Sequence, residues 1–249
     1  MIENESIYSR RHMVTGAGVA AGAALVLGQT TWGAETNKGM IHIQKDALTP
    51  MEDLACQHAV ARRVLLVYQM GAGGAAGSAQ MPMQSLTTAA TMIRSMVEDF
   101  HAKFEEDYVF PLFQKAGKLT DLVSTLRDQH AVGRRLTDSI LQAIQGPAAN
   151  APTEALTRNL MAYVHMIQAH TAYEETLLYP QIRAIASDAD YERLQATLQD
   201  ADRTKLGPEG VPGLLNKVAD LERSAGIMGL AQFTPKPSGE PVARETSTR

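Results

Sequence analysis

Four segments of this chain combine the apolar periodicity of an amphipathic helix with a histidine in the middle of the apolar stripe. Steps of three and four residues between apolar positions are typical of a helix with one buried face. An imidazole is costly to bury without a partner, so four of them at matching places predict that the helices bring them together. The segments run from about 48 to 71, 82 to 117, 119 to 146 and 153 to 183, and the histidines are His58, His101, His130 and His170.

The ends of these segments carry helix start and stop signals. The stretch TPME at 49–52 has a capping threonine, a proline at the first helical position and a glutamate three residues after the cap. Gly117 and the Gly-Pro pair at 146–147 are stop signals, and Thr153 can cap the last segment. The signals therefore delimit four separate helices.

Helices of roughly 20–30 residues with short connections predict an all-α fold, an antiparallel up-down four-helix bundle over 48–185. Shorter helices are expected over 186–230, and a polar, proline-rich tail over 231–249 is expected to be disordered. The net charge of −4 comes without a basic stripe, so the sequence predicts no nucleic-acid partner.

Two of the histidines open the same eleven-residue pattern. HAKFEEDYVFP starts at His101, and HTAYEETLLYP starts at His170. Each copy has an aromatic residue three positions after the histidine, glutamates at four and five, an aromatic residue at nine and a proline at ten. Composition alone predicts about 0.4 His-x-x-x-Glu pairs in the chain, so the shared pattern needs a structural explanation.

The spacing of the pattern predicts a metal site. A histidine and a glutamate four residues apart lie on one face of a helix, one turn from each other. Nitrogen and carboxylate ligands suit iron, manganese or zinc, and a carboxylate can bridge two metals roughly 3.5–4 Å apart. Six ionisable groups in one core layer would be costly to bury without a metal. The candidate ligands are His58, His101, Glu105, His130, His170 and Glu174.

Charged residues beside these ligands are expected to support the site or to lie outside it. Glu106 and Glu175 point about 100° from the preceding glutamates on an ideal helix, which favours a solvated or supporting role over ligation. Arg134, one turn after His130, either pairs with a carboxylate at the rim or is a plain surface residue. His165 is expected to lie off the site.

Pro111 and Pro180 end the two copies of the pattern. A proline inside a helix lacks an N–H group and clashes with the carbonyl four residues earlier. We therefore expect each to kink or end its helix and to free the carbonyls of Asp107 and Thr176.

The first 36 residues resemble an export signal. SRR at 9–11 precedes an uncharged, Gly- and Ala-rich run at 13–27, which is similar to a twin-arginine signal for export to the periplasm. A helix of that length is shorter than a hydrocarbon core of roughly 30 Å, so we expect no membrane span in the mature protein. An ordinary secretory signal and an uncleaved anchor are the alternatives.

The pattern H…HxxxE…H…HxxxE, with an aromatic residue and a proline after each second histidine, resembles the hemerythrin-like proteins with the HHE cation-binding domain. The resemblance covers about 50–183. It implies an antiparallel four-helix bundle around a non-haem centre, usually of two irons with an oxo or hydroxo bridge. It also implies that the six candidate ligands hold the metal, with Glu105 and Glu174 as bridges.

The chain departs from the oxygen-carrying hemerythrins at two positions. Those proteins have a second histidine where this chain has Arg134, and an aspartate five residues after the last histidine, where this chain has Glu175. Four histidines in place of five leave a coordination position for water or an exogenous ligand. The resemblance thus implies an iron protein that takes up O₂, NO or peroxide, with reversible oxygen storage in doubt.

Other functions remain open at this point. An enzyme that processes peroxide or NO, a ferroxidase and a bundle with a purely structural metal fit the same residues. Ferritin-like bundles have Glu-x-x-His on two helices, a spacing that Glu98 and His101 match once. Ile167 stands at the matching place before His170, which disfavours that class. No catalytic residue and no protein partner follow from the sequence.

Overall fold

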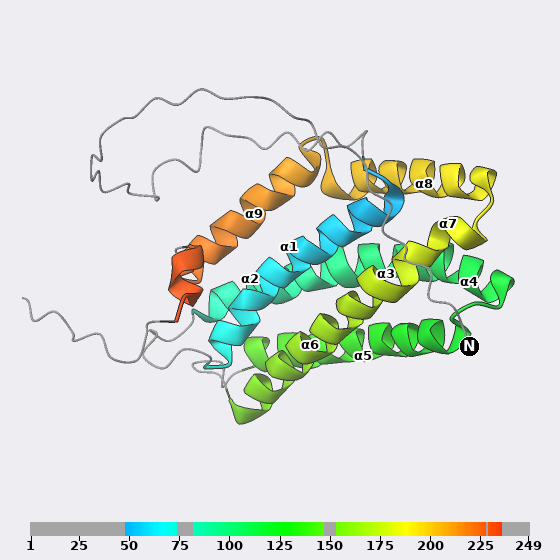
Figure 1. Ribbon diagram of the computed structural model, residues 1–249. Coiled ribbons are helices and arrows are strands. Elements are labelled where there is room, and N and C mark those ends of the chain that lie inside the picture. The colour runs from blue at the N-terminus through cyan, green and yellow to red at the C-terminus, as the bar shows by residue number, and fades with distance from the viewer. Residues whose placement is uncertain (1–47, 74–81, 147–152, 228, 236–249) are drawn as a thin grey trace, which may run out of the picture. The chain divides into compact units, whose positions relative to one another are not determined.

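The computed structural model describes residues 48–73, 82–146, 153–227 and 229–235. All regular structure in these ranges is helical, which confirms the predicted all-α class (Figure 1). The predicted export signal, most of the loop after the first helix and most of the C-terminal tail lie outside the described residues. Among the described helices, none is long and apolar enough to cross a membrane.

The first helix, α1, begins as its sequence predicts. It spans Pro50–Gly71, and the Thr49 hydroxyl accepts a hydrogen bond from the Glu52 backbone N–H at 3.3 Å. The Glu52 carboxylate in turn accepts one from the Thr49 backbone N–H at 2.8 Å, so the capping box is complete. Residues at steps of three and four along α1 form one buried face, at Leu54, His58, Ala61, Leu65 and Tyr68.

The second helical stretch alternates between α-helical and π-helical turns. Its elements are α2 (Met83–Met92), η2 (a π-helix, Ile93–His101), α3 (Ala102–Phe104), η3 (a π-helix, Glu105–Val109) and α4 (Phe110–Ala116). Gly117 ends it in a left-handed conformation with φ 62°, as predicted.

The fourth stretch repeats this change of pitch. It comprises α6 (Glu154–Tyr173), η4 (a π-helix, Glu174–Leu178), η5 (a 3-10 helix, Tyr179–Gln181) and α7 (Ile182–Ile185). Thr153 caps its start as predicted, accepting a hydrogen bond from the Leu156 backbone N–H at 3.1 Å.

Of the two predicted effects of Pro111 and Pro180, a kink or an end of the helix, the second is wrong, because the chain stays helical past both. A π-helical turn ends two residues before each proline, at η3 and at η4. The N–H of Phe110 therefore bonds to the carbonyl of Glu105, five residues earlier. This wider turn shifts the backbone that a proline ring would meet in a regular α-helix.

The long helices pack around a layer that contains the histidines. Helix α5 (Thr120–Gln145) contacts α6 and α2, and α1 contacts the same two helices. One apolar cluster, with Tyr68 and Ile140, fills one end of the core. A second, with Leu54 and Phe113, fills the other end. Along each of the four stretches, the histidine lies between residues of these two clusters.

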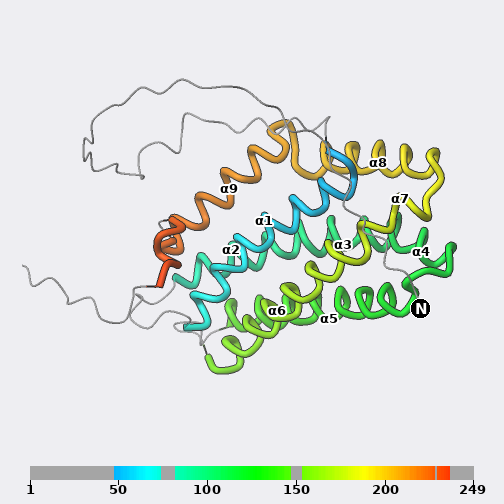
Figure 2. The backbone as a smooth tube through the Cα atoms, in the orientation of Figure 1, coloured from blue at the N-terminus to red at the C-terminus, as the bar shows by residue number. Residues whose placement is uncertain are grey.

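Two further helices follow this core. Helix α8 (Asp188–Leu206) contacts α1, and α9 (Gly210–Ser224) contacts α1, α2 and α8. Figure 2 shows α9 running beside α1. Leu214, Val218 and Leu221 of α9 belong to the buried core. A short 3-10 helix, η6 (Leu230–Phe233), includes the first residues of the segment predicted to be a disordered tail.

Candidate metal centre

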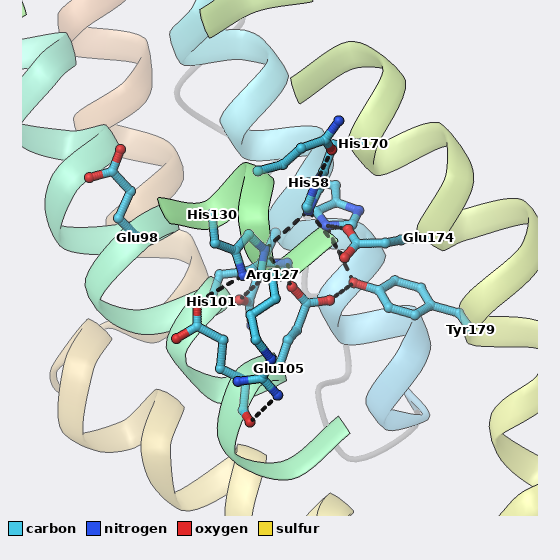
Figure 3. Close-up of polar contacts among 12 residues, drawn as sticks. His58, Glu98, His101, Glu105, Arg127, His130, His170, Glu174 and Tyr179 are labelled. Carbon is cyan, nitrogen blue, oxygen red and sulfur yellow. Dashed lines mark hydrogen bonds and ion pairs between the residues drawn. The ribbon is translucent and has the colours of Figure 1, made fainter. Parts of the chain in front are cut away.

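The six predicted ligands meet in two overlapping groups (Figure 3). Within each group, one nitrogen or oxygen atom from every residue lies within 4.8 Å of the others. Glu105 and Glu174 belong to both groups, whereas each histidine belongs to one. This is the arrangement expected of two carboxylates shared between two metal positions. The first group is His58, His101, Glu105 and Glu174; the second is Glu105, His130, His170 and Glu174.

The two carboxylates face histidines of both groups. Glu174 Oε2 lies 3.3 Å from His58 Nε2, and Glu174 Oε1 lies 3.1 Å from His170 Nε2. Glu105 Oε2 lies 3.5 Å from Nε2 of His101 and 3.5 Å from Nε2 of His130. Both glutamates are fully buried, so water cannot solvate their charge.

The Nδ1 atom of each of the four candidate histidine ligands has a partner. His58 Nδ1 lies 3.0 Å from Glu175 Oε1, and His130 Nδ1 lies 3.0 Å from Glu106 Oε1. The other two partners are Gln57 Oε1, at 3.0 Å from His101 Nδ1, and Gln129 Oε1, at 2.9 Å from His170 Nδ1. Because these oxygens accept hydrogen bonds, each Nδ1 carries the proton in a neutral ring and each Nε2 keeps its lone pair toward the centre.

This arrangement leaves lone pairs facing one another. The Nε2 atoms of His130 and His170 lie only 3.1 Å apart, and in the neutral rings neither carries a proton. His101 Nε2, Glu105 Oε2 and both carboxylate oxygens of Glu174 are buried without a hydrogen-bond partner. Buried acceptors without donors are costly, and a cation between them removes that cost. The chemistry of the six side chains therefore fits a metal.

The supporting residues come from a second repeat that the sequence analysis missed. QHAVARR occupies 57–63 and QHAVGRR occupies 129–135. In each copy the glutamine bonds to the histidine of the following helical stretch, as described above. The first arginine of each motif binds a carboxylate, Arg62 to Glu175 at 2.8 Å and Arg134 to Glu106 at 2.9 Å. A search for repeats in the first and third helices would have found this signal.

The carboxylates next to the candidate ligands are therefore supporting residues. Glu106 and Glu175 contact the Nδ1 atoms of His130 and His58, as a supporting role predicts, and Arg134 forms an ion pair with Glu106. For Glu106, burial alone would raise the pKa, but the bonds to His130 and Arg134 lower it to about 2. For Glu175, the hydrogen bond from His58, together with Arg62, lowers the pKa to about 2 despite partial burial.

The two central glutamates differ electrostatically. Burial and the nearby charge of Glu174 raise the pKa of Glu105 well above its usual value. Burial acts in the same direction on Glu174, but contacts with His170 and His58 outweigh it and lower its pKa. The two carboxylates thus repel each other, and the neighbouring histidines favour the negative charge on Glu174.

Two aromatic residues, one beside each group of candidate ligands, make the two groups different. Tyr179 stacks on His58 with ring centroids 5.6 Å apart, and Phe110 stacks on His130 at 5.5 Å. These two residues hold the same place in the repeated pattern, but only the tyrosine has a hydroxyl. That hydroxyl donates a hydrogen bond to Glu105 Oε1 at 2.7 Å and lies 3.3 Å from His58 Nε2.

Other ionisable candidates lie apart from the centre. His165 is exposed on α6, as predicted. Glu98 is buried but outside both groups, and Figure 3 shows it away from the histidines. It accepts a hydrogen bond from Thr137 at 2.6 Å and pairs with Arg94 at 3.1 Å. The ferritin-like use of Glu98 as a ligand therefore has no support.

Comparison with protein families agrees with this geometry. The model of the hemerythrin HHE cation-binding domain matches residues 49–182, which include all six candidate ligands. The chain belongs to this family. It is also 36% identical over 231 residues to the uncharacterized protein Rv1995 of Mycobacterium tuberculosis and, to the same degree, to the uncharacterized protein Mb2018 of Mycobacterium bovis. Each match covers 91% of both chains, and so includes α8 and α9. No solved structure matches the chain.

Proposed function

We propose that this HHE-domain protein binds two irons between four antiparallel helices and takes up O₂, NO or peroxide at an open coordination position. The observation that supports this best is the pair of His₂Glu₂ groups that share both glutamates. His58, His101, His130 and His170 would supply nitrogen ligands, and Glu105 and Glu174 would bridge. Imidazole with carboxylate suits iron, manganese or zinc, and the family favours iron among them.

The chain's own residues would prepare the centre for this ligand. The Nδ1 partners fix the ring orientation and tautomer of each histidine, which raises the basicity of the nitrogen that faces the metal. With four histidines and two shared carboxylates, two irons are not saturated by protein ligands. When bound, the irons would supply an open coordination position for a small molecule and would donate electron density to it.

Metal analysis with Mössbauer and optical spectra of the purified protein tests the proposal. We expect close to two irons per chain and new absorption bands after NO or peroxide is added to the reduced protein. Zinc as the only metal after growth in iron-rich medium, or a centre that never changes its spectrum with these ligands, would refute it. The second outcome would favour a structural metal.

Repeated addition of peroxide or NO separates a carrier from the alternative, an enzyme that processes these molecules. Steady consumption over many equivalents, with the centre returning to its starting spectrum, would identify the enzyme. Iron(II) oxidation without saturation at two equivalents would identify a ferroxidase. Stoichiometric uptake would identify a binding protein.

A further inference from the structure

A small cavity lies against the histidines of the centre. Its volume is about 30 Å³, and all four candidate histidine ligands line it, whereas Glu105 and Glu174 do not. The cavity therefore opens on the imidazole side of the centre, away from the shared carboxylates. A cavity of this kind needs roughly 10–15 Å³ to hold one water, so this one has room for a molecule of about two heavy atoms.

The remaining lining of the cavity is mostly apolar. Met96, Val97 and Ile167 contribute apolar side chains. The polar side chains there are already engaged, because Gln57 bonds to His101 and the Thr171 hydroxyl accepts a bond from Arg62 at 3.3 Å. An anion entering this cavity would lose its hydration without gaining a charged partner other than the centre itself. An uncharged diatomic molecule is weakly hydrated, so it would lose little hydration free energy on entering.

Two leucines from the C-terminal helices complete the lining. Leu206 is the last residue of α8, and Leu214 lies on α9. Both come after residue 182, where the match to the family domain ends. Leu206 is partly exposed, as Met96 and Val97 are, whereas Leu214 is buried. The C-terminal helices thus add a partly exposed side chain and a buried one to the cavity lining that the family domain supplies.

Resting on the function proposed above, we propose that α8 and α9 form an access gate for an uncharged diatomic ligand, NO or O₂, with Leu206 as its outer residue. A second cavity, of about 310 Å³, is the competing route. It lies between α5 and α6 beside Thr125 and Tyr173, and His170 is the one candidate ligand on its lining. The second cavity therefore borders only one of the two proposed metal positions. The apolar cavity borders both, because histidines of both groups line it.

Stopped-flow mixing of the reduced, iron-loaded protein with NO tests the gate. We expect Leu206→Trp to slow adduct formation by about tenfold and Leu206→Ala to accelerate it, with unchanged iron content and final spectrum. Thr125→Trp, at the mouth of the other cavity, is the matched control and should leave the rate within twofold of the parent. Leu206→Phe gives a milder obstruction if the tryptophan variant does not fold.

The outcomes separate the gate from the function of the centre. Unchanged rates in the iron-loaded Leu206 variants, with a normal final NO spectrum, would overturn the gate and leave the proposed function standing. A slower rate in Thr125→Trp alone would assign access to the second cavity and would also overturn it. Iron-loaded parent protein that forms no NO adduct would overturn both proposals.

Discussion

The Tyr179 hydroxyl donates a hydrogen bond to Glu105 at 2.7 Å, and so ties the fourth helical stretch to a carboxylate of the second. Phe110, the counterpart of Tyr179 in the repeat, makes no such bond because it has no hydroxyl. The two halves of the centre are otherwise closely matched in their histidines, their Nδ1 partners and their arginines. Tyr179 therefore makes the His58–His101 position different from the His130–His170 position.

Replacing Tyr179 by phenylalanine should make the two metal positions more alike. We expect two distinct iron doublets in the Mössbauer spectrum of the oxidised parent, and doublets that move together in Tyr179→Phe with iron content unchanged. Phe110→Tyr is the matched variant and should shift the other doublet. Identical spectra for the parent and Tyr179→Phe would show that the hydroxyl does not affect the environment of either iron.

Loss of one histidine from either group should remove metal. His101→Ala and His170→Ala each delete one ligand from a different His₂Glu₂ group, so each protein should lose at least one iron per chain, measured by elemental analysis. His165→Ala is the control, because that histidine is exposed on the same helix as His170. Two irons retained in both ligand variants would disprove the assignment.

The convergence of the six candidate ligands was predictable because the helix repeat fixes the relative positions of residues on one helix. His101 and Glu105 lie one turn apart in any helix, and the apolar stripe decides which side of the helix faces the core. The four histidines then converge if the helix midpoints share one level. Capping signals at Thr49 and Thr153 set the helix starts, and the structure confirms both.

The supporting contacts and the behaviour of the prolines were less predictable from local pattern. Reasoning from an ideal α-helix cannot anticipate the π-helical turns that begin at Glu105 and Glu174, because they depend on tertiary packing. These turns precede the prolines, and the chain stays helical past Pro111, where the sequence predicted either a kink or an end of the helix. Contacts such as Gln57 with His101 join separate helices, so spacing within one helix does not reveal them.

The glutamines of the QHAV repeats should tune metal affinity without being ligands. Gln57→Ala and Gln129→Ala each remove the oxygen that holds one histidine Nδ1–H, so we expect affinity to fall by about 10–100-fold while the protein stays folded. Competition with a chelator, followed by iron release, measures the change. Gln168→Ala, at an exposed position of α6, should match the parent. Equal affinity in all three variants would mean that the glutamines do not orient the rings.

Export by the twin-arginine route is a prediction from residues outside the described part of the chain. That route carries folded proteins, so the metal could be acquired in the cytoplasm, where supply controls which metal enters a nitrogen and oxygen site. Changing Arg10 and Arg11 together to lysine should leave the protein in the cytoplasm, folded and iron-loaded, as fractionation and metal analysis would show. Wild-type amounts in the periplasm would instead indicate an ordinary secretory signal.

Glu98 offers a pH test that is separate from the metal ligands. Its pKa is raised by burial, an effect that the bonds to Thr137 and Arg94 offset only in part. The folded protein therefore holds this proton at a pH where the unfolded chain has lost it. The stabilisation from Glu98 is complete at a pH below the pKa of this residue in the unfolded chain. It is lost as the pH rises through the pKa that Glu98 has in the folded protein.

A glutamine at this position keeps an acceptor for Thr137 but cannot titrate. The difference in melting temperature between iron-loaded Glu98→Gln and the parent should therefore shift in favour of the variant as the pH rises from about 4.5 toward 8. The metal centre titrates alike in both proteins, so its contribution cancels in this difference. The exposed Glu154→Gln is the control and should follow the parent at every pH. A difference that stays flat, or that shifts in favour of the parent, would show that Glu98 is already ionised throughout this range.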